Sequence, residues 1–162
     1  MSTALISNRE ELRTRLKRFA RCPVSCAPTP LDRMENLSRE FGANLYIKRD
    51  DMTGLAFGGN KARKLDFIMA DAIRKGATSI VTWAGVQSNW CRQVAAAARK
   101  FNIRPVLLLF QRPGLPTDID GNLLLDHLFG ADVYLTELAA GQQIMKGWCP
   151  LVYLGMITCP IL

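Results

Sequence analysis

The sequence predicts an α/β fold in which a parallel sheet is flanked by helices in three layers. From Lys61 onward, segments with apolar residues at helical spacing alternate with short apolar runs that are typical of strands. These runs are apolar at successive positions, as in parallel strands that are buried on both faces. Ligand sites in such sheets lie at the carboxyl ends of strands, so we expect the function in the loops that follow them.

Short elements separated by turns are expected before residue 61. Ser7 and Glu10 form a capping box that predicts a first helix. Its apolar face is expected to consist of Leu12, Leu16 and Phe19. Prolines within 22–30 end this helix, and a second helix follows that ends at Gly42. The apolar face of the second helix comprises Met34, Leu37 and Phe41.

The regular alternation follows a short strand over 45–48 and a glycine-rich loop over 50–60. A helix is expected to begin near Lys61 and to stop at Gly76. Its apolar stripe consists of Leu65, Ile68, Met69, Ala72 and Ile73. The remaining elements are expected in this order: a strand over 79–83, a helix over 89–100, a strand over 104–110, a helix over 122–129 ended by Gly130, and a strand over 131–135.

Charge and hydropathy limit the classes of partner. The chain of 162 residues carries a formal charge of +7, and more than half of the excess lies within 9–21. A basic helix can contact nucleic acid, but a solvated helix face explains the same charge, and we expect no nucleic-acid partner. No apolar run reaches the ~18–20 residues of a membrane helix. Because 1–20 is also too basic for a secretory signal, we expect a cytoplasmic protein with no membrane association.

The cysteines and the histidine argue against a disulfide framework and against a metal site. Five cysteines are an odd number, and without a secretory signal they are expected as free thiols in a reducing compartment. Cys22 and Cys26 lack the second pair of ligands that a zinc site needs. Because His127 is the only histidine, we expect neither a metal nor a Ser-His-Asp triad.

The loop before Lys61 is the first candidate functional site. Its glycines at 54, 58 and 59 would let another group approach the backbone closely. A lysine at a helix start lies at the positive end of the helix dipole, and Arg63 and Lys64 add like charge. Both effects favour the neutral amine, which is the form that reacts with a carbonyl. A flexible turn beside a solvated basic face is the alternative that these residues leave open.

The loop over 84–89 is the second candidate site. Ser88 and Asn89 are favourable N-cap residues, and free backbone N–H groups at a helix start bind a carboxylate or a phosphate. The place of this loop at the carboxyl end of an expected strand favours a ligand site. A plain N-cap without a ligand is the alternative.

Four segments that include these loops resemble one family of enzymes. They are Pro-Thr-Pro-Leu at 28–31, Tyr-Ile-Lys-Arg-Asp-Asp at 46–51, Gly-Leu-Ala-Phe-Gly-Gly-Asn-Lys-Ala-Arg-Lys-Leu at 54–65, and Gln-Ser-Asn at 87–89. In this order they resemble the pyridoxal-phosphate enzymes typified by D-cysteine desulfhydrase and 1-aminocyclopropane-1-carboxylate deaminase. These enzymes belong to the tryptophan-synthase-β-like group, called fold type II, and the resemblance covers 28–146.

The resemblance implies a role for each polar residue of the two loops. Lys61 would bind pyridoxal phosphate covalently and would later move the α-proton of the substrate. Ser88 would hold the substrate carboxylate, Asn89 would hydrogen-bond the 3′-oxygen of the cofactor, and Lys64 would reach its phosphate. The implied activity is that of a lyase or deaminase acting on a small amino acid, such as D-cysteine, which would give pyruvate, ammonia and sulfide.

The resemblance also implies part of a large cofactor domain, 1–63, followed by a complete small α/β domain, 64–146. The remaining residues, 147–162, form an atypical tail without charged residues. The glycine-rich phosphate site and the later tyrosines of the family have no counterpart, so we expect a truncated member. Trp90 and Ala84 also depart from the family pattern. A non-catalytic chain that associates with a full-length partner, or with a second copy as a homo-oligomer, is the alternative.

Overall fold

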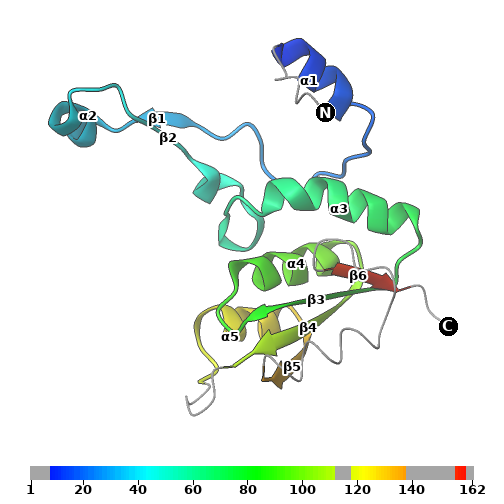
Figure 1. Ribbon diagram of the computed structural model, residues 1–162. Helices are drawn as coiled ribbons and strands as arrows, with labels where there is room; N and C mark the ends of the chain where they lie inside the picture. Colours follow the sequence, from blue (N-terminus) through cyan, green and yellow to red (C-terminus); the bar gives the residue numbers. More distant parts are fainter. Residues whose placement is uncertain (1–7, 112–117, 138–155, 160–162) are drawn as a thin grey trace, which may run out of the picture.

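The computed structural model describes residues 8–111 and 118–137, together with the backbone of 156–159. Its helices are α1 (Arg9–Leu16), α2 (Glu35–Phe41), η1 (Asp50–Met52), η2 (Leu55–Phe57), α3 (Ala62–Arg74), α4 (Asn89–Lys100) and α5 (Gly121–Leu128). Its strands are β1 (Leu31–Arg33), β2 (Tyr46–Lys48), β3 (Ser79–Gly85), β4 (Arg104–Phe110), β5 (Asp132–Thr136) and β6 (Met156–Cys159). Figure 1 shows a body built on β3–β5, from which the first elements extend as an arm.

The body contains the parallel sheet that the sequence predicts. β3 pairs in parallel with β4, starting from Ser79 opposite Arg104, and β4 pairs in parallel with β5. Helices α4 and α5 connect these strands, and the expected bounds of 89–100 and 104–110 agree with α4 and β4. One strand, β6, was not predicted. It pairs antiparallel with β3, at the edge that β4 leaves free. The four-stranded sheet therefore has the order β5-β4-β3-β6.

Hydrophobic clusters join the helices to one face of this sheet. The cluster between α3, α4 and β3 contains Leu65, Met69, Ala72, Ala77, Ile80, Val94, Ala97, Ala98 and Ile103, together with Val24. The cluster between α4, α5 and β4 contains Cys91, Ala95, Leu107, Leu109 and Leu123. Each fully buried large aliphatic side chain contributes roughly 1.5–3 kcal/mol to stability. On the opposite face, Val81, Trp83, Val106 and Leu108 form a cluster of strand residues only, so the described residues show two of the three expected layers.

Helix α3 carries the expected stripe and also ties the preceding chain to the body. Leu65, Met69 and Ala72 are fully buried, whereas Ile73 is exposed. The Asp66 carboxylate, 2% exposed, accepts hydrogen bonds from the backbone N–H groups of Val24 and Ser25 and from the Ser25 hydroxyl. It also pairs with the Arg21 guanidinium at 2.5 Å. Burial alone would raise the pKa of Asp66, but these donors outweigh burial and hold the pKa below its ordinary value.

The first helix differs from its prediction in both its cap and its packing. Asn8 is the N-cap, and its side chain accepts from the Glu10 N–H, while Ser7 lies outside the described residues. No residue of α1 is buried. Leu12, Leu16 and Phe19, which form its expected apolar face, are all exposed, Phe19 by 64%. Helical periodicity predicts which side chains share a face but not which surface covers them, and none of the described residues buries this face.

The arm contains the second expected helix and a hairpin-like pair of strands. Gly42 ends α2 in the left-handed conformation, with φ of 61°. The predicted apolar face of α2 is not buried against the body, since Phe41 is 67% exposed and Ser38 is the buried residue. β1 pairs antiparallel with β2, which lies within the strand expected over 45–48. β1 was missed because three residues are too few to show an alternating pattern.

The described residues bear on two expectations, that the chain has no membrane-spanning helix and that it has no metal site. None of the helices in the described part of the chain is long and apolar enough to span a membrane. Within the described ranges, no three residues among His, Cys, Asp and Glu come together as a metal site. Cys22, Cys26 and Cys91 are free thiols, while Cys149 lies outside the described residues.

Candidate functional site

The loop before Lys61 is a tightly packed turn and not the flexible segment that its glycines permit. Most of the stretch expected as irregular loop forms the two short helices η1 and η2. Thr53 is fully buried inside it, and its hydroxyl lies 2.9 Å from the Gly59 nitrogen and 2.8 Å from the Gly59 oxygen. The Gly59 N–H also donates to the carbonyl oxygen of Asp50 at 2.8 Å. The loop closes on itself around Thr53.

Two glycines of this loop have no room for a side chain. Gly58 has φ of 73°, and a Cβ there would lie 1.8 Å from the backbone oxygen of Asp51. Gly59 has φ of 129°, and a Cβ there would lie 2.5 Å from the amide nitrogen of Gln93. Left-handed φ values and close backbone approach together require glycine at these positions. The Gly-Gly pair is therefore needed to bring the loop against α4.

Arg63 connects the first turn of α3 to the base of the arm. Its guanidinium donates to the Asp50 carboxylate at 2.7 Å and to the Thr29 hydroxyl at 2.8 Å. The Lys48 ammonium contacts the Thr29 carbonyl and hydroxyl oxygens and lies 3.2 Å from the Pro30 carbonyl oxygen. Arg63, which belongs to the basic run that could have been a solvated face, thus forms hydrogen bonds within the fold.

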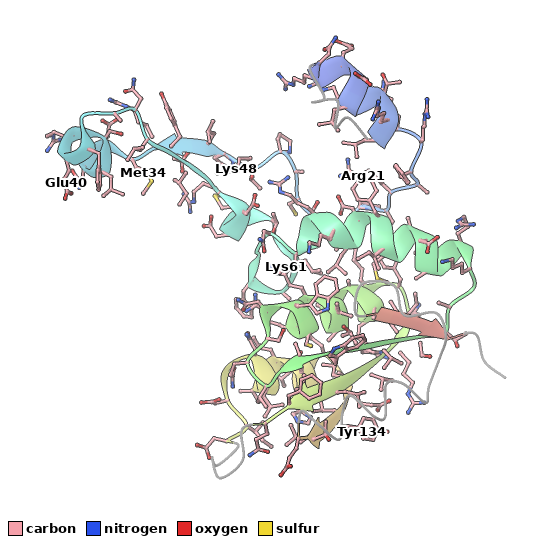
Figure 2. All side chains as sticks on the ribbon, in the orientation of Figure 1. Arg21, Met34, Glu40, Lys48, Lys61 and Tyr134 are labelled. Atoms are coloured by element: carbon pink, nitrogen blue, oxygen red, sulfur yellow. The ribbon has the colours of Figure 1, made fainter. Side chains whose placement is uncertain are left out.

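Lys61 itself is available for chemistry. It stands at the N-cap position of α3, as expected, and its side chain is half-buried. Its Nζ donates to the Asn60 side-chain oxygen at 2.9 Å, which is its hydrogen bond among the described residues. Figure 2 shows Lys61 where the loop enters α3, beside the start of α4.

The second candidate loop follows β3, at the carboxyl end of the parallel sheet. Ser88 is the N-cap of α4, and its side-chain oxygen accepts from the N–H groups of Trp90 and Cys91. Ser88 thus acts as the N-cap that the sequence predicts. In both bonds its oxygen is the acceptor, so they do not involve its hydroxyl hydrogen. Asn89 is exposed, and its side-chain oxygen accepts from Asn122 Nδ2 at 3.0 Å. Trp90, which departs from the family pattern, packs inward and donates to the Thr82 hydroxyl at 2.9 Å.

The two loops meet through side chains at the start of α4. Arg92 Nη2 and Gln93 Nε2 both donate to the carbonyl oxygen of Gly58, at 3.2 and 2.5 Å. The Lys64 ammonium lies 5.8 Å from the centre of the Trp90 ring, one residue after Asn89. The structure thus brings Lys61 and Lys64 to the same end of α4 as Ser88 and Asn89.

Arg92, Gln93 and Asn122 were not singled out from the sequence. Gln93 is fully buried, and its other side-chain atom, Oε1, has no partner among the described residues. A signal for Gln93 existed, because it falls on the apolar stripe of α4, three residues from Trp90 and four from Ala97. A polar side chain on a buried stripe needs a hydrogen-bond partner, and here that partner is Gly58.

A buried carboxyl group lies beneath these contacts. Asp126 of α5 is 0% exposed, and neither of its oxygens has a hydrogen-bond partner within the described ranges. Burial raises the pKa of Asp126 to about 7, and the positive charge of Arg92 opposes that rise. Burial also raises the pKa of the neighbouring Cys91 thiol to about 12, so this cysteine stays protonated and unreactive at neutral pH.

The donors at this end of α4 fit part of a pyridoxal phosphate molecule. A lysine amine on a fixed loop can bond to the aldehyde carbon, and the Asn89 NH₂ group donates to no described residue, so it can meet a ring oxygen. The Ser88 hydroxyl faces the Cys91 thiol, and the Lys64 ammonium supplies positive charge. The described residues contain no cradle of backbone N–H groups for the phosphate, so the fit covers the ring and its aldehyde.

Comparison with known proteins decides the family. Residues 24–147 match the family described as pyridoxal-phosphate dependent enzyme, which is most of the chain. This chain belongs to that family. The matched segment ends within one residue of 146, where the resemblance read from the sequence also ends. The fold type II assignment agrees with two similar solved structures.

The structures differ in how closely they resemble the chain. A homologue of 1-aminocyclopropane-1-carboxylate (ACC) deaminase has a TM-score of 0.76 at 35% identity, over 86% of this chain and 42% of that one. A processed threonine deaminase isoform 2 from Solanum lycopersicum has a TM-score of 0.60 at 23% identity, over 81% of this chain and 36% of that one. The second likeness shows the fold alone.

Two curated relatives are named for different activities. An ACC deaminase from Bradyrhizobium diazoefficiens is 41% identical over 82% of this chain and 41% of its own length. A D-cysteine desulfhydrase from Salmonella paratyphi B is 43% identical over 75% of this chain and 38% of its own length. The chain therefore spans about 40% of the length of the curated relatives that it matches.

Of the three changes Gly58→Ala, Gly76→Ala and Gly85→Ala, the first should lower the free energy of unfolding most. Gly76→Ala places a Cβ in open space at φ of 67°, which costs about 1–2 kcal/mol of conformational strain. Gly58→Ala adds the clash with Asp51, so a further 1–3 kcal/mol is expected. Gly85→Ala, in open space without a positive φ, should be nearly neutral. Urea unfolding of the three variants measures the differences, and equal losses for Gly58→Ala and Gly76→Ala would contradict the packed loop.

Asp126 should make the chain less stable as the pH rises from about 4 to 7. In this window the unfolded chain releases the Asp126 proton while the folded chain retains it, so unfolding is favoured by each step in pH. The loss amounts to about 2–4 kcal/mol. Asp126→Asn removes this titration, so the variant should match the wild type at about pH 3, below the range of the loss, and exceed its free energy of unfolding at pH 8. Asp118→Asn, an exposed control, should follow the wild-type curve. If the free energies of unfolding of the wild type and of Asp126→Asn, measured in urea, change with pH in the same way, the buried carboxyl is contradicted.

Proposed function

We propose that this chain binds pyridoxal phosphate through Lys61 and catalyses elimination and deamination of a small amino acid, with D-cysteine as the expected substrate. The observation that carries the proposal is the junction of the two loops at Gly58. Arg92 and Gln93 hold the carbonyl of that residue against α4. The Lys61 amine and the Asn89 NH₂ group thereby share one end of the helix, at the carboxyl end of the parallel sheet.

The residues of the site would divide the work between binding and proton transfer. Bound pyridoxal phosphate supplies an electron sink for the Cα–H bond of an attached amino acid. Ser88 and the backbone N–H of Asn89 at the start of α4 would hold the carboxylate of the amino acid. Lys64 would balance the charge of the phosphate, since an ammonium is a suitable partner for it. The Lys61 amine, at the end of a fixed loop, would take the proton from Cα.

The proposed reaction balances for D-cysteine. The Cα–H bond breaks and its proton passes to the Lys61 amine, while the Cα–H electron pair forms a Cα–Cβ double bond. The Cβ–S bond breaks with its electron pair and sulfur leaves as hydrogen sulfide. The unsaturated amino acid that remains takes up one water, giving pyruvate and ammonia. No external oxidant or reductant is needed.

A second candidate function is association with a longer protein chain, without catalysis. The arm favours it, because its large apolar residues are exposed: Leu31, Leu37, Phe41, Tyr46, Ile47 and Met52. Exposed apolar surface of this kind is typical of a protein–protein contact. A second copy of this chain could cover the same surface as a homo-oligomer.

Borohydride reduction in the presence of pyridoxal phosphate tests the role of Lys61. The reduction makes the bond between the lysine nitrogen and the aldehyde carbon irreversible, and peptide mass mapping then locates the label. We expect label on Lys61 alone, saturating at low cofactor concentration. Lys61→Arg should abolish it, whereas Lys75→Arg, an exposed lysine at the other end of α3, should leave it unchanged. Label spread over many lysines would reject the cofactor site.

Product analysis tests the reaction and its substrate. With D-cysteine, sulfide, ammonia and pyruvate should appear in equal amounts. With ACC no sulfide can form, so ammonia and an equal amount of a four-carbon 2-oxo acid would identify the deaminase activity. Ser88→Asp retains an acceptor for the N–H groups of Trp90 and Cys91 but repels a carboxylate. It should lower kcat/KM at least about tenfold with little change in stability. Labelled but inactive protein would favour the second candidate function.

A further inference from the structure

A chain of hydrogen bonds joins the lysine loop to Asn89 through Arg92 and Asn122. Arg92 Nη1 donates to Asn122 Oδ1 at 2.8 Å, and the same guanidinium donates to Gly58 through Nη2. Asn122 Nδ2 then donates to Asn89 Oδ1 at 3.0 Å and to the Gln87 carbonyl oxygen at 2.8 Å. The chain crosses from α4 to the start of α5 and back.

The first member of this chain determines the direction of all the others. A guanidinium can donate hydrogen bonds but cannot accept them, so Asn122 must turn its oxygen toward Arg92. Its NH₂ group then faces the loop and donates to Asn89. Asn89 must therefore present its oxygen to Asn122, and its own NH₂ group is left pointing away from the chain. Among the described residues, nothing accepts a hydrogen bond from that NH₂ group.

The position of Asn122 is itself held by the loop that contains Asn89. The Asn122 backbone N–H donates to Gln87 Oε1 at 2.8 Å, and Gln87 Nε2 donates to the Asp120 carboxylate at 2.9 Å. Gly121, between them, allows this approach, because a Cβ there would lie 2.6 Å from Gln87 Oε1. The amide of Asn122 is therefore fixed in position as well as in direction.

We propose that Asn122 and Arg92 are positioning residues that set the orientation of the Asn89 amide, so that the site offers a hydrogen-bond donor and not an acceptor. The group that this donor suits is a negatively charged oxygen on the ring of the bound cofactor. The inference rests on the proposed function, since it concerns the same cofactor site. It adds that α5, which carries none of the residues expected to bind the cofactor, controls the polarity of the site.

The substitution Asn122→Asp tests the direction of the chain. The carboxylate that it introduces would still accept from Arg92, now with charge assistance, but could not donate to Asn89. Asn89 would then turn its NH₂ group toward this carboxylate and its oxygen toward the cofactor. Because a hydrogen bond to a charged group is replaced by two facing acceptors, we expect pyridoxal phosphate to bind about ten- to a hundredfold more weakly.

The order of two variants separates positioning from a general structural role. Asn122→Ala removes the partner of Asn89 and leaves its amide free to rotate, so binding should weaken by less than in Asn122→Asp. A residue that merely fills space would give the opposite order, since aspartate preserves the shape of asparagine. Spectrophotometric titration with pyridoxal phosphate gives the dissociation constants, and urea unfolding of the same samples shows whether stability has changed.

Asn102→Asp is the matched control, because it makes the same chemical change at an exposed position at the far end of α4. It should bind the cofactor as the wild type does. Wild-type affinity in Asn122→Asp, or a larger loss in Asn122→Ala than in Asn122→Asp, would overturn the inference. A wild-type chain that is not labelled at Lys61 would instead overturn the proposed function, so the two failures are distinguishable.

A second variant covers the case in which Asn122→Asp does not unfold cooperatively. Asn89→Asp can still accept from Asn122 but has no NH₂ group to offer. It should therefore lose the same ten- to hundredfold in affinity for pyridoxal phosphate. Unchanged affinity in Asn89→Asp would show that no donor is needed at this position, which would also overturn the inference.

Discussion

One backbone carbonyl, that of Gly58, connects the elements of this site. It accepts from Arg92 and Gln93, the two adjacent polar side chains near the start of α4. Without it, Arg92 Nη2 and Gln93 Nε2 would each lose a hydrogen-bond acceptor. That loss lowers stability, because Gln93 is fully buried. The carbonyl can reach α4 only because residues 58 and 59 lack side chains. This contact therefore fixes the lysine loop on α4, and the same Arg92 guanidinium extends the connection to Asn122 at the start of α5.

Two buried aspartates show how differently the fold treats the same chemical group. Asp66 receives four hydrogen bonds, and its ionised form contributes to holding the chain before α3 against the body. Asp126 receives none among the described residues, and burial favours its protonated form. A carboxyl group without donors is a cost in stability that a stable structure could avoid with an apolar residue. Its place beneath Arg92 means that this cost falls directly under the site.

The body of the fold was predictable from the sequence because local signals and burial agree there. Helix α4 and strand β4 have the expected bounds, and Gly42 and Gly130 end helices with the positive φ that such positions require. The apolar faces expected for α1 and α2 are exposed among the described residues, since periodicity identifies a face but not its partner. Lys61 and Ser88 are candidates that the sequence of their loops predicts, and their roles stay predictions. Asn122 was not, because its role depends on the direction of a hydrogen bond from another helix.

The pairing of the strands has a consequence for the order in which the chain acquires structure. β3 joins β4, and β4 joins β5, each across one intervening helix, so each pairing closes a loop of about 25 residues. Such parallel pairings are non-local contacts and form more slowly than helices do. The segment near Pro23 instead meets α3 through Asp66 and the end of α4 through Lys100, whose ammonium lies 2.5 Å from the Pro23 oxygen. During synthesis the segment near Pro23 can therefore take its place only after α3 and the end of α4 have been made.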